Sequence, residues 1–378
     1  MDSIPFFLHD LGQPELDSVA RILSSPILTT GEAVQDFENK FATVMGRRYA
    51  LGVTSCTGAL HMSLLALGVG PGDEVITTPM SFLATATAII EAGAKPVFVD
   101  VESDTGNLDA GRVEGAITPR TKAILPVHLY GLMCDMKALR EIADRRGLAL
   151  IEDAAHCIEG TRNGVRPGQL GSTACFSFYA TKTLTCGEGG AVVTDSEELY
   201  ERMRMLRHHG MTKTAADRMR DGYQHWDMAE FGWKYNMSNI EAALLLPQFQ
   251  RLQDNHRLRG RLARLYAEHL SGIGGVLLPS SRDDATHSWH LYTIRVPADR
   301  RDQVIKGFTR DGIGCAVNYR PIHLTTYFRN AFGFKERDFP NAERIGSETI
   351  SLPFYPKMPP AHIPAVAESL RRTLERGR

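Results

Sequence analysis

The feature that most constrains the fold is an alternation of short apolar segments and helical segments between residues 49 and 194. The apolar segments have the length and composition of buried strands and lie at residues 49–54, 74–79, 96–101, 122–129, 148–153, 174–179 and 190–194. Helical patterns separate several of them, for example at residues 136–146. This alternation is typical of an α/β fold with a mainly parallel sheet covered by helices on both faces.

The second feature is the length of the chain, which at 378 residues predicts one large and one smaller lobe. A long helical pattern crosses residues 238–262, and Pro247 inside it should interrupt the helix. We place the boundary there, with a large domain at 1–250 and a smaller α+β domain at 251–378. Strands are expected at 291–296 and 314–319 in the smaller domain, with a helix at 304–311.

Composition narrows the class of protein. The net charge is −1 and no strongly basic segment stands out, which argues against nucleic acid as a partner. Neither a secretory leader nor an uninterrupted apolar run of membrane-spanning length is evident, so no membrane partner is expected. The six cysteines lack CxxC pairs and metal-ligand spacing, which predicts reduced thiols, no metal site and a cytoplasmic location.

Lys182 is the first candidate functional residue. It follows an aromatic, apolar strand pattern and precedes a turn with Gly187, Gly189 and Gly190, where the backbone can approach a ligand closely. Burial lowers the pKa of an amine and leaves it nucleophilic toward carbonyl carbons. The alternative is a lysine that caps a helix end beside a structural turn.

Two upstream motifs supply what a carbonyl cofactor on Lys182 would need. Pyridoxal 5′-phosphate (PLP) requires a Schiff-base lysine, an acidic partner for its ring nitrogen and a phosphate cradle. The predicted strand at 148–153 ends in Asp153, where parallel sheets place ligand chemistry. Residues 55–59, with Thr57 and Gly58, open a helix directly after a strand, although simple helix capping would explain them equally well. The G-x-G-x-x-G spacing of dinucleotide enzymes is absent around the glycine-rich turn.

Segments across nearly the whole chain match one known family in its order and spacing. They are Leu28-Thr29-Thr30-Gly31, residues 54–60, residues 72–76, residues 151–156, residues 176–190, residues 235–243 and residues 319–323. The chain resembles the DegT/DnrJ/StrS family of PLP-dependent nucleotide-sugar aminotransferases, which have fold type I. With His156 after the Glu-Asp-Ala-Ala run, it is most similar to the subgroup that makes UDP-4-amino-4-deoxy-L-arabinose.

The resemblance implies catalytic roles for three residues. Lys182 matches the lysine that forms the Schiff base and then carries the proton between substrate and cofactor. Asp153 matches the carboxylate paired with the pyridinium nitrogen. His156 matches a position near the phenolic oxygen of the cofactor, and a buried structural histidine is the alternative.

Further cofactor contacts are implied in the same way. Thr57, Gly58 and Ser177 match phosphate ligands. Phe82 matches the aromatic residue that stacks on the cofactor ring, although an aromatic residue at such a turn more commonly packs in the core. Asn236 matches an asparagine that reaches the phosphate from the neighbouring subunit, which implies a homodimer with shared active sites.

The substrates follow from the resemblance too. They are L-glutamate, which gives 2-oxoglutarate, and a nucleotide-linked keto sugar, in a ping-pong cycle through pyridoxamine phosphate. Thr30, Arg320 and His323 are the candidate substrate contacts, although the segment that contains Thr30 would suit packing as well. Relatives that remove a hydroxyl carry histidine at the lysine position, so Lys182 favours transamination.

Other functions stay open at this point. The keto group, expected at C4, could be at C3 or belong to a ketocyclitol, and sugar selectivity is expected from loops 212–230 and 320–330. The amino sugar would serve lipopolysaccharide, another surface glycan or a related product. A regulatory protein that binds nucleotide sugar or PLP without turnover is the alternative from a different class.

Overall fold

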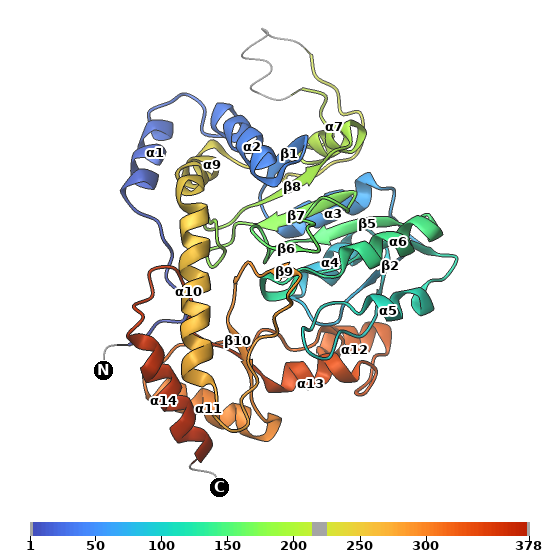
Figure 1. The fold of residues 1–378 in the computed structure, drawn as a ribbon. Helices are drawn as coiled ribbons and strands as arrows, with labels where there is room; N and C mark the ends of the chain where they lie inside the picture. Colours follow the sequence, from blue (N-terminus) through green and yellow to red (C-terminus); the bar gives the residue numbers. More distant parts are fainter. Residues whose placement is uncertain (1–2, 214–224, 376–378) are drawn as a thin grey trace.

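The computed structural model describes residues 3–213 and 225–375 (Figure 1). Its centre is one sheet of seven strands, in the order β1 (Tyr49–Val53), β8 (Gly190–Thr194), β7 (Thr173–Ser177), β5 (Ala149–Asp153), β4 (Thr121–Leu125), β2 (Glu74–Thr77) and β3 (Lys95–Phe98). Only β8 runs against the others, being antiparallel to both β1 and β7. The predicted mainly parallel sheet is therefore confirmed. Residues 214–224 of the predicted loop at 212–230 lie outside the described residues.

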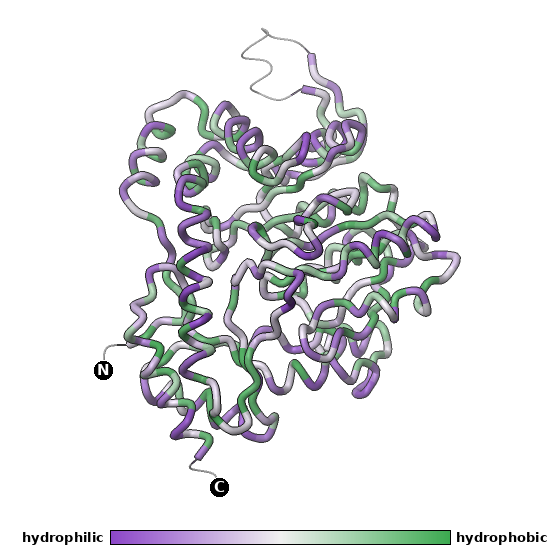
Figure 2. Tube along the Cα trace, viewed as in Figure 1, coloured by the Kyte–Doolittle hydropathy of each residue, from purple (hydrophilic) through white to green (hydrophobic). Residues whose placement is uncertain are grey.

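Helices cover both faces of the sheet. On one face α3 (Cys56–Ala66), α4 (Ala84–Glu91) and α7 (Glu197–Leu206) enclose a core with the strands. The opposite face carries α2 (Glu32–Met45), α6 (Met136–Arg146) and α9 (Asn239–Leu245). The strands are buried almost throughout, as their apolar composition predicts, and Figure 2 shows the hydrophobic colour along the centre of the molecule.

Local sequence signals set several helix boundaries. At the start of α6, Asp135 accepts a hydrogen bond from the Ala138 amide (3.2 Å), and the helix ends at Gly147 in the left-handed conformation. Pro247 lies in a short 3₁₀ segment (Leu246–Arg251) that separates α9 from α10 (Leu252–Leu270). The predicted interruption of this long helical pattern is thus confirmed.

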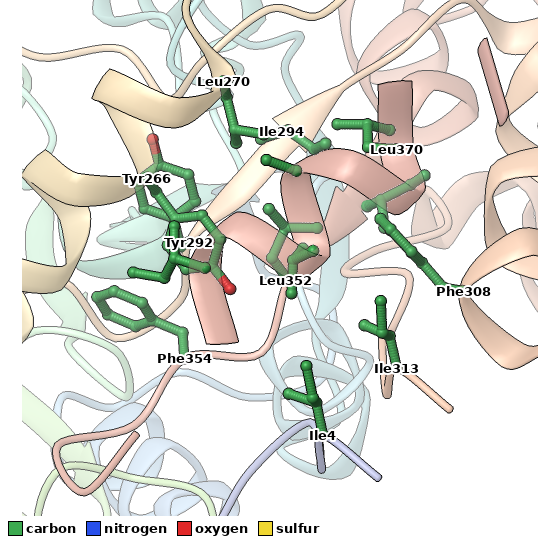
Figure 3. Packing of buried hydrophobic residues seen from close by; sticks show 14 of the residues in the cluster. Ile4, Tyr266, Leu270, Tyr292, Ile294, Phe308, Ile313, Leu352, Phe354 and Leu370 are labelled. Atoms are coloured by element: carbon green, nitrogen blue, oxygen red, sulfur yellow. The ribbon is translucent and has the colours of Figure 1, made fainter. Parts of the chain in front are cut away.

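A second core lies at the C-terminal end of α10, the long upright helix in Figure 1. Its buried side chains come from α10, β10 (Thr293–Arg295), β11 (Thr349–Ser351), α11 (Ala298–Arg310) and α14 (His362–Glu375). Figure 3 shows Tyr266, Tyr292, Phe308 and Leu352 gathered there. We propose the domain boundary at the start of α10, because this core draws almost entirely on residues beyond 251.

The remaining elements are short or peripheral. They are α1 (Gln13–Leu23), α5 (Ala110–Val113), α12 (Thr326–Phe332), α13 (Pro340–Glu348), β6 (Thr161–Arg162), β9 (Ala285–Thr286) and three further 3₁₀ turns (Glu114–Ala116, Leu129–Gly131 and Ile322–Leu324).

The strand predicted at 314–319 is wrong. β10 pairs with β11 instead, and Ala316 touches that sheet only through a bridge to Ser351. One backbone group that a continuing ladder would need, the Asn318 carbonyl, is taken by a side chain. The Ser351 hydroxyl donates to Asn318 Oδ1 (2.7 Å), and the Tyr130 hydroxyl donates to the Asn318 carbonyl. The segment therefore ends as an irregular loop.

The N-terminal segment returns to the small domain. Ile4 forms a parallel bridge with Ile313, and its side chain is buried in the second core (Figure 3). Farther along, Arg251 pairs with Asp10 (2.9 Å) and Glu15 (2.8 Å), which ties this segment to the start of α10. Residues far apart in sequence thus close the molecule around the carboxyl ends of the strands.

Candidate active site

The carboxyl ends of β5 and β7 and the start of α3 open onto one cavity of about 480 Å³, a volume in the range of small-molecule sites. Six predicted site residues line it: Thr57, Phe82, Asp153, His156, Ser177 and Lys182. The facing wall comes from the C-terminal part of the chain and includes His290, Leu291, Asn318 and Tyr319. The sheet therefore brings together residues that lie far apart in sequence.

Lys182 projects into this cavity from the turn after β7. Its amide donates to the Tyr179 carbonyl (2.9 Å), and its Nζ lies 3.4 Å from His290 Nε2. Burial lowers the pKa of Lys182 to about 8, against an opposing influence of Cys56 and Asp153. About a tenth of the amine is therefore neutral at pH 7, far more than for an unperturbed lysine, and the amine points to a cavity rather than to a helix end.

Asp153 ends β5 with its carboxylate buried on the cavity wall. Oδ2 accepts a hydrogen bond from the Thr85 hydroxyl (2.8 Å), and Oδ1 accepts one from the Ala155 amide (3.1 Å). Burial raises the pKa of Asp153, while these hydrogen bonds and the nearby Lys182 oppose that rise. A cationic group bound against this carboxylate would favour its ionised form.

The start of α3 offers unused hydrogen-bond donors. Ser55 caps the helix by accepting from the Gly58 amide (3.1 Å). The preceding amides, of Cys56 and Thr57, have no acceptor among the described residues. Together with the Thr57 hydroxyl on the cavity wall, they suit an anion at the positive end of a helix dipole. Gly58 itself does not line the cavity, and its missing side chain lets the Tyr235 ring pack on the helix.

Ser177 and Phe82 complete this side of the cavity. Ser177 ends β7 and accepts a hydrogen bond from the Tyr179 amide (3.3 Å) through its hydroxyl oxygen. The hydroxyl hydrogen is therefore free to donate to a ligand. The Phe82 side chain is 58% exposed and its ring centre lies 6.1 Å from that of Tyr319, so it is an accessible aromatic surface rather than a core residue.

His156 occupies the wall between Lys182 and the C-terminal part of the chain. Burial and the positive charge of Lys182 hold the pKa of His156 well below its usual range, so the ring is neutral. Its Nδ1 accepts from the Tyr130 amide (3.2 Å), which places the proton on Nε2. Nε2 therefore donates to the Tyr319 hydroxyl (3.1 Å), which holds the two rings together on the cavity wall.

Four predicted residues lie away from this cavity. Asn236 donates through Nδ2 to the Thr30 hydroxyl (2.7 Å), and its side chain also contacts that of His208. Arg320 is exposed and donates to the Leu324 carbonyl (2.9 Å). His323 is fully buried beside Glu343 (3.0 Å), which makes it a packing residue in this chain rather than part of the cavity wall.

Two residues on the wall had no assigned role in the sequence. Tyr319 stood within a matched motif, but nothing in the sequence indicated its contact with His156. His290 lies in a loop outside every matched segment, between the short strand β9 and β10, where neither periodicity nor spacing marks a functional residue. Only the folded chain places these two side chains opposite β5 and β7.

These features place the protein among the fold type I enzymes that use PLP. The amine, the carboxylate, the free amides and the aromatic ring of the cavity suit the aldehyde, the ring nitrogen, the phosphate and the ring face of that cofactor. Residues 9–371 match the model of the DegT/DnrJ/EryC1/StrS aminotransferase family, and the chain belongs to this family. It is accordingly a PLP-dependent sugar aminotransferase, as the resemblance predicted.

Individual relatives are similar over almost their whole length. The Bacillus subtilis (strain 168) spore coat polysaccharide biosynthesis protein SpsC is 41% identical over 374 residues, which are 97% of this chain and 96% of SpsC. The crystal structure of S. venezuelae DesV is 37% identical with a TM-score of 0.88, covering 95% of this chain and 93% of DesV. Streptococcus pneumoniae Spr1654 in its pyridoxamine phosphate form is 29% identical with a TM-score of 0.94, covering 99% of each chain.

Two further observations concern the described residues as a whole. None of the helices in residues 3–213 and 225–375 has both the length and the apolar character needed to span a bilayer. Within the same residues, histidine, cysteine and carboxylate side chains form no group of three or more that could hold a metal ion.

Proposed function

We propose that the protein transfers an amino group from L-glutamate to C4 of a nucleotide-linked keto sugar. The observation that carries the proposal is the Lys182 amine, with its pKa lowered to about 8, facing the same cavity as the buried Asp153 carboxylate. A lysine amine with a lowered pKa that shares a cavity with a fixed carboxylate is the pair of groups that amino transfer on PLP requires. The C4 position rests on the similarity of residues 151–156 to the 4-amino-sugar subgroup.

Each residue has a defined task in this proposal. PLP, when bound, supplies an aldehyde for the amino group and a ring that withdraws electrons. Lys182 Nζ binds the cofactor and, once released, moves the proton at the substrate carbon. Asp153 holds a positive ring nitrogen in place, aided by the hydrogen bond from Thr85.

The other wall residues orient ligands. The amides of Cys56 and Thr57, with the Ser177 hydroxyl, would hold the phosphate at the start of α3. His156 would lie at the phenolic oxygen of the cofactor with Tyr319 fixed against it. Phe82 would cover one face of the ring, which also excludes water from that side.

The alternative functions differ from the proposal in the substrate or in the absence of turnover. A keto group at C3, or a ketocyclitol substrate, would use the same lysine and carboxylate, so only the choice of substrate distinguishes them. A regulatory protein without turnover is not supported, because the chain matches an aminotransferase family and keeps the lysine and carboxylate that turnover requires, Lys182 and Asp153. A product for a surface glycan such as lipopolysaccharide is supported by the similarity to SpsC, whose name refers to a spore coat polysaccharide.

The first experiment follows the cofactor by absorbance. Adding excess L-glutamate to the PLP form is expected to remove the visible band of the lysine-bound cofactor and produce the near-ultraviolet band of pyridoxamine phosphate. Adding the accepted nucleotide-linked 4-keto sugar should then restore the visible band, whereas a 3-keto isomer should restore it much more slowly. A visible band that L-glutamate leaves unchanged would contradict the proposed donor, and faster restoration by the 3-keto isomer would contradict the C4 assignment.

We also propose a homodimer in which Asn236, with Thr30 beside it, serves the cavity of the partner subunit. In the described chain the Asn236 side chain lies outside the cavity of its own subunit, and its Nδ2 donates to the Thr30 hydroxyl (2.7 Å). An amide nitrogen carries two donors, so the second is available for a phosphate oxygen across the subunit interface.

A mixed dimer tests this arrangement. Lys182→Ala should be inactive, and Asn236→Ala should bind PLP about 10- to 100-fold more weakly, since it loses a hydrogen bond to a charged group. If Asn236 acts across the interface, mixed dimers of the two variants contain one site with both residues, and wild-type PLP affinity returns to half of the sites. If Asn236 acts within its own chain, mixing restores nothing.

The cytoplasmic location belongs to the proposal as well. All six cysteines are free in the structure, five of them buried, and none is paired in a disulfide. That state suits a reducing compartment.

A further inference from the structure

His290 lies in direct contact with the reactive end of Lys182. Its Nε2 is 3.4 Å from the lysine Nζ, and its ring centre is 4.5 Å from that of His156. The side chain is only 6% exposed and faces the main cavity. The proposed roles of the other wall residues leave this histidine without a task.

The loop that carries His290 is held on its backbone. The His290 amide donates to the Tyr130 carbonyl (3.1 Å), and the Ser288 amide donates to the Gly131 carbonyl (2.8 Å). Gly131 has a φ of 107°, and a Cβ atom there would lie 2.9 Å from the Trp289 nitrogen and 3.0 Å from that of His290. Only glycine allows the two segments to approach this closely, so the position of the histidine is built into the fold.

The contact with Lys182 determines which nitrogen of the His290 ring carries the proton. Burial, together with the positive charges of Lys182 and other neighbours, holds the pKa of His290 well below its usual range, so its ring is neutral. Besides Lys182, the groups that affect the pKa of His290 are His156, Arg259 and His287. The groups that affect the pKa of Lys182 are Cys56 and Asp153. A lysine ammonium has donors only, so His290 Nε2 must present its lone pair to Nζ and carry its proton on Nδ1.

We propose that His290 is a positioning residue for Lys182. Nε2 of His290 accepts a hydrogen bond from Nζ of Lys182 and thereby turns the amine lone pair away from the histidine and toward the cavity. The acceptor excludes the staggered position of the Cε–Nζ bond in which the lone pair faces His290, so the lone pair faces the cavity in one of two remaining positions instead of one of three. The inference rests on the proposed role of Lys182 as the cofactor-binding lysine. It does not depend on which amine donor or sugar the enzyme uses.

The first test measures the reactivity of Lys182 in the enzyme without cofactor. Acetylation of Lys182 by acetic anhydride is followed against pH by mass spectrometry, and the wild-type midpoint is expected at about pH 8. In His290→Leu the ammonium loses its acceptor, so the midpoint should fall by about one pH unit. His290→Gln places an amide oxygen within reach of Nζ and should return the midpoint toward the wild-type value.

The second test measures capture of the cofactor. The visible band of lysine-bound PLP is recorded at a pH where the amine is neutral in every variant, so that only its orientation differs. His290→Leu should capture PLP about 1.5-fold more slowly, because the lone pair then faces the cavity in one of three staggered positions rather than in one of two. His290→Gln should be close to wild type, and His290→Asn, polar but too short to reach Nζ, should behave like the leucine variant.

His287 provides the matched control in the same loop. It is buried, accepts a hydrogen bond from the Trp289 amide through Nδ1 (2.8 Å) and does not line the main cavity. His287→Asn keeps an acceptor for that amide and should leave the midpoint and the capture rate unchanged.

Three outcomes would overturn the inference. One is an unchanged midpoint and capture rate in His290→Leu, or in His290→Asn if the leucine variant does not fold. Another is an equal shift in His287→Asn, which would assign the effect to disturbance of the loop. The third is failure of His290→Gln to restore either value. Both tests use apoenzyme and PLP alone, so they are separate from the glutamate and keto-sugar tests of the proposed function.

Discussion

Replacing Lys182 with alanine is expected to leave a folded protein that has lost transamination. The turnover rate should fall by at least about 10⁴-fold, because general acid–base catalysis alone contributes up to that factor and the covalent link to the cofactor is lost as well. The side chain projects into the cavity rather than into a packed core, so removing it should not impair folding. Steady-state turnover, circular dichroism and the visible cofactor band measure the three effects separately.

Lys182→Arg is the matched control for charge. Arginine keeps a positive group in the cavity but cannot act as a neutral nucleophile, so it should be as inactive as the alanine variant. A small primary amine added to Lys182→Ala should restore part of the activity, since it supplies the missing base. Turnover of either variant within tenfold of wild type would remove Lys182 from its assigned role.

Asp153→Asn is the second substitution with a large expected effect. The amide retains the shape of the carboxylate but not its charge, so PLP should still bind while turnover falls. The expected decrease in turnover is about 10- to 1,000-fold, because a carboxylate next to a cationic group such as the ring nitrogen shifts its pKa by about one to three units. Turnover with saturating L-glutamate and a PLP titration separate slower chemistry from weaker binding.

Thr85→Val gives a graded comparison at the same place. It keeps the Asp153 carboxylate and removes one of its hydrogen bonds, that from the Thr85 hydroxyl (2.8 Å). Turnover should therefore decrease, but by less than in Asp153→Asn. Normal rates in Asp153→Asn, or a larger defect in Thr85→Val, would contradict the assigned role of the carboxylate.

The part of the site that the sequence could predict lies where local signals are strongest. The carboxyl end of a buried parallel strand can be recognised in the sequence. The position of Asp153 on the cavity wall could therefore be inferred from its residue type and its place in the strand. A capped helix that follows a strand is equally local, which located the donors at the start of α3. The sheet and its helices follow from the same short-range patterns.

The facing wall could not be predicted because it depends on contacts between segments far apart in sequence. The contact between His156 and Tyr319 joins residues 163 positions apart, and that between Lys182 and His290 joins residues 108 apart. The wrong strand at 314–319 has the same origin. Its apolar pattern suits a ladder, but the Tyr130 hydroxyl binds the Asn318 carbonyl, and the Ser351 hydroxyl binds the Asn318 side chain.

The bridge between Ile4 and Ile313 has a consequence for how the enzyme is made. Phe6, two residues farther along, lines the cavity. This edge of the site can therefore form only after a segment about three hundred residues downstream has been synthesised. At synthesis rates of about 5–20 residues per second, that delay is roughly 15–60 s. During this interval the sheet can form on the ribosome with Asp153 and Lys182 already in place, while PLP lacks the wall that would retain it. Cofactor capture should therefore come last, after the chain has been completed.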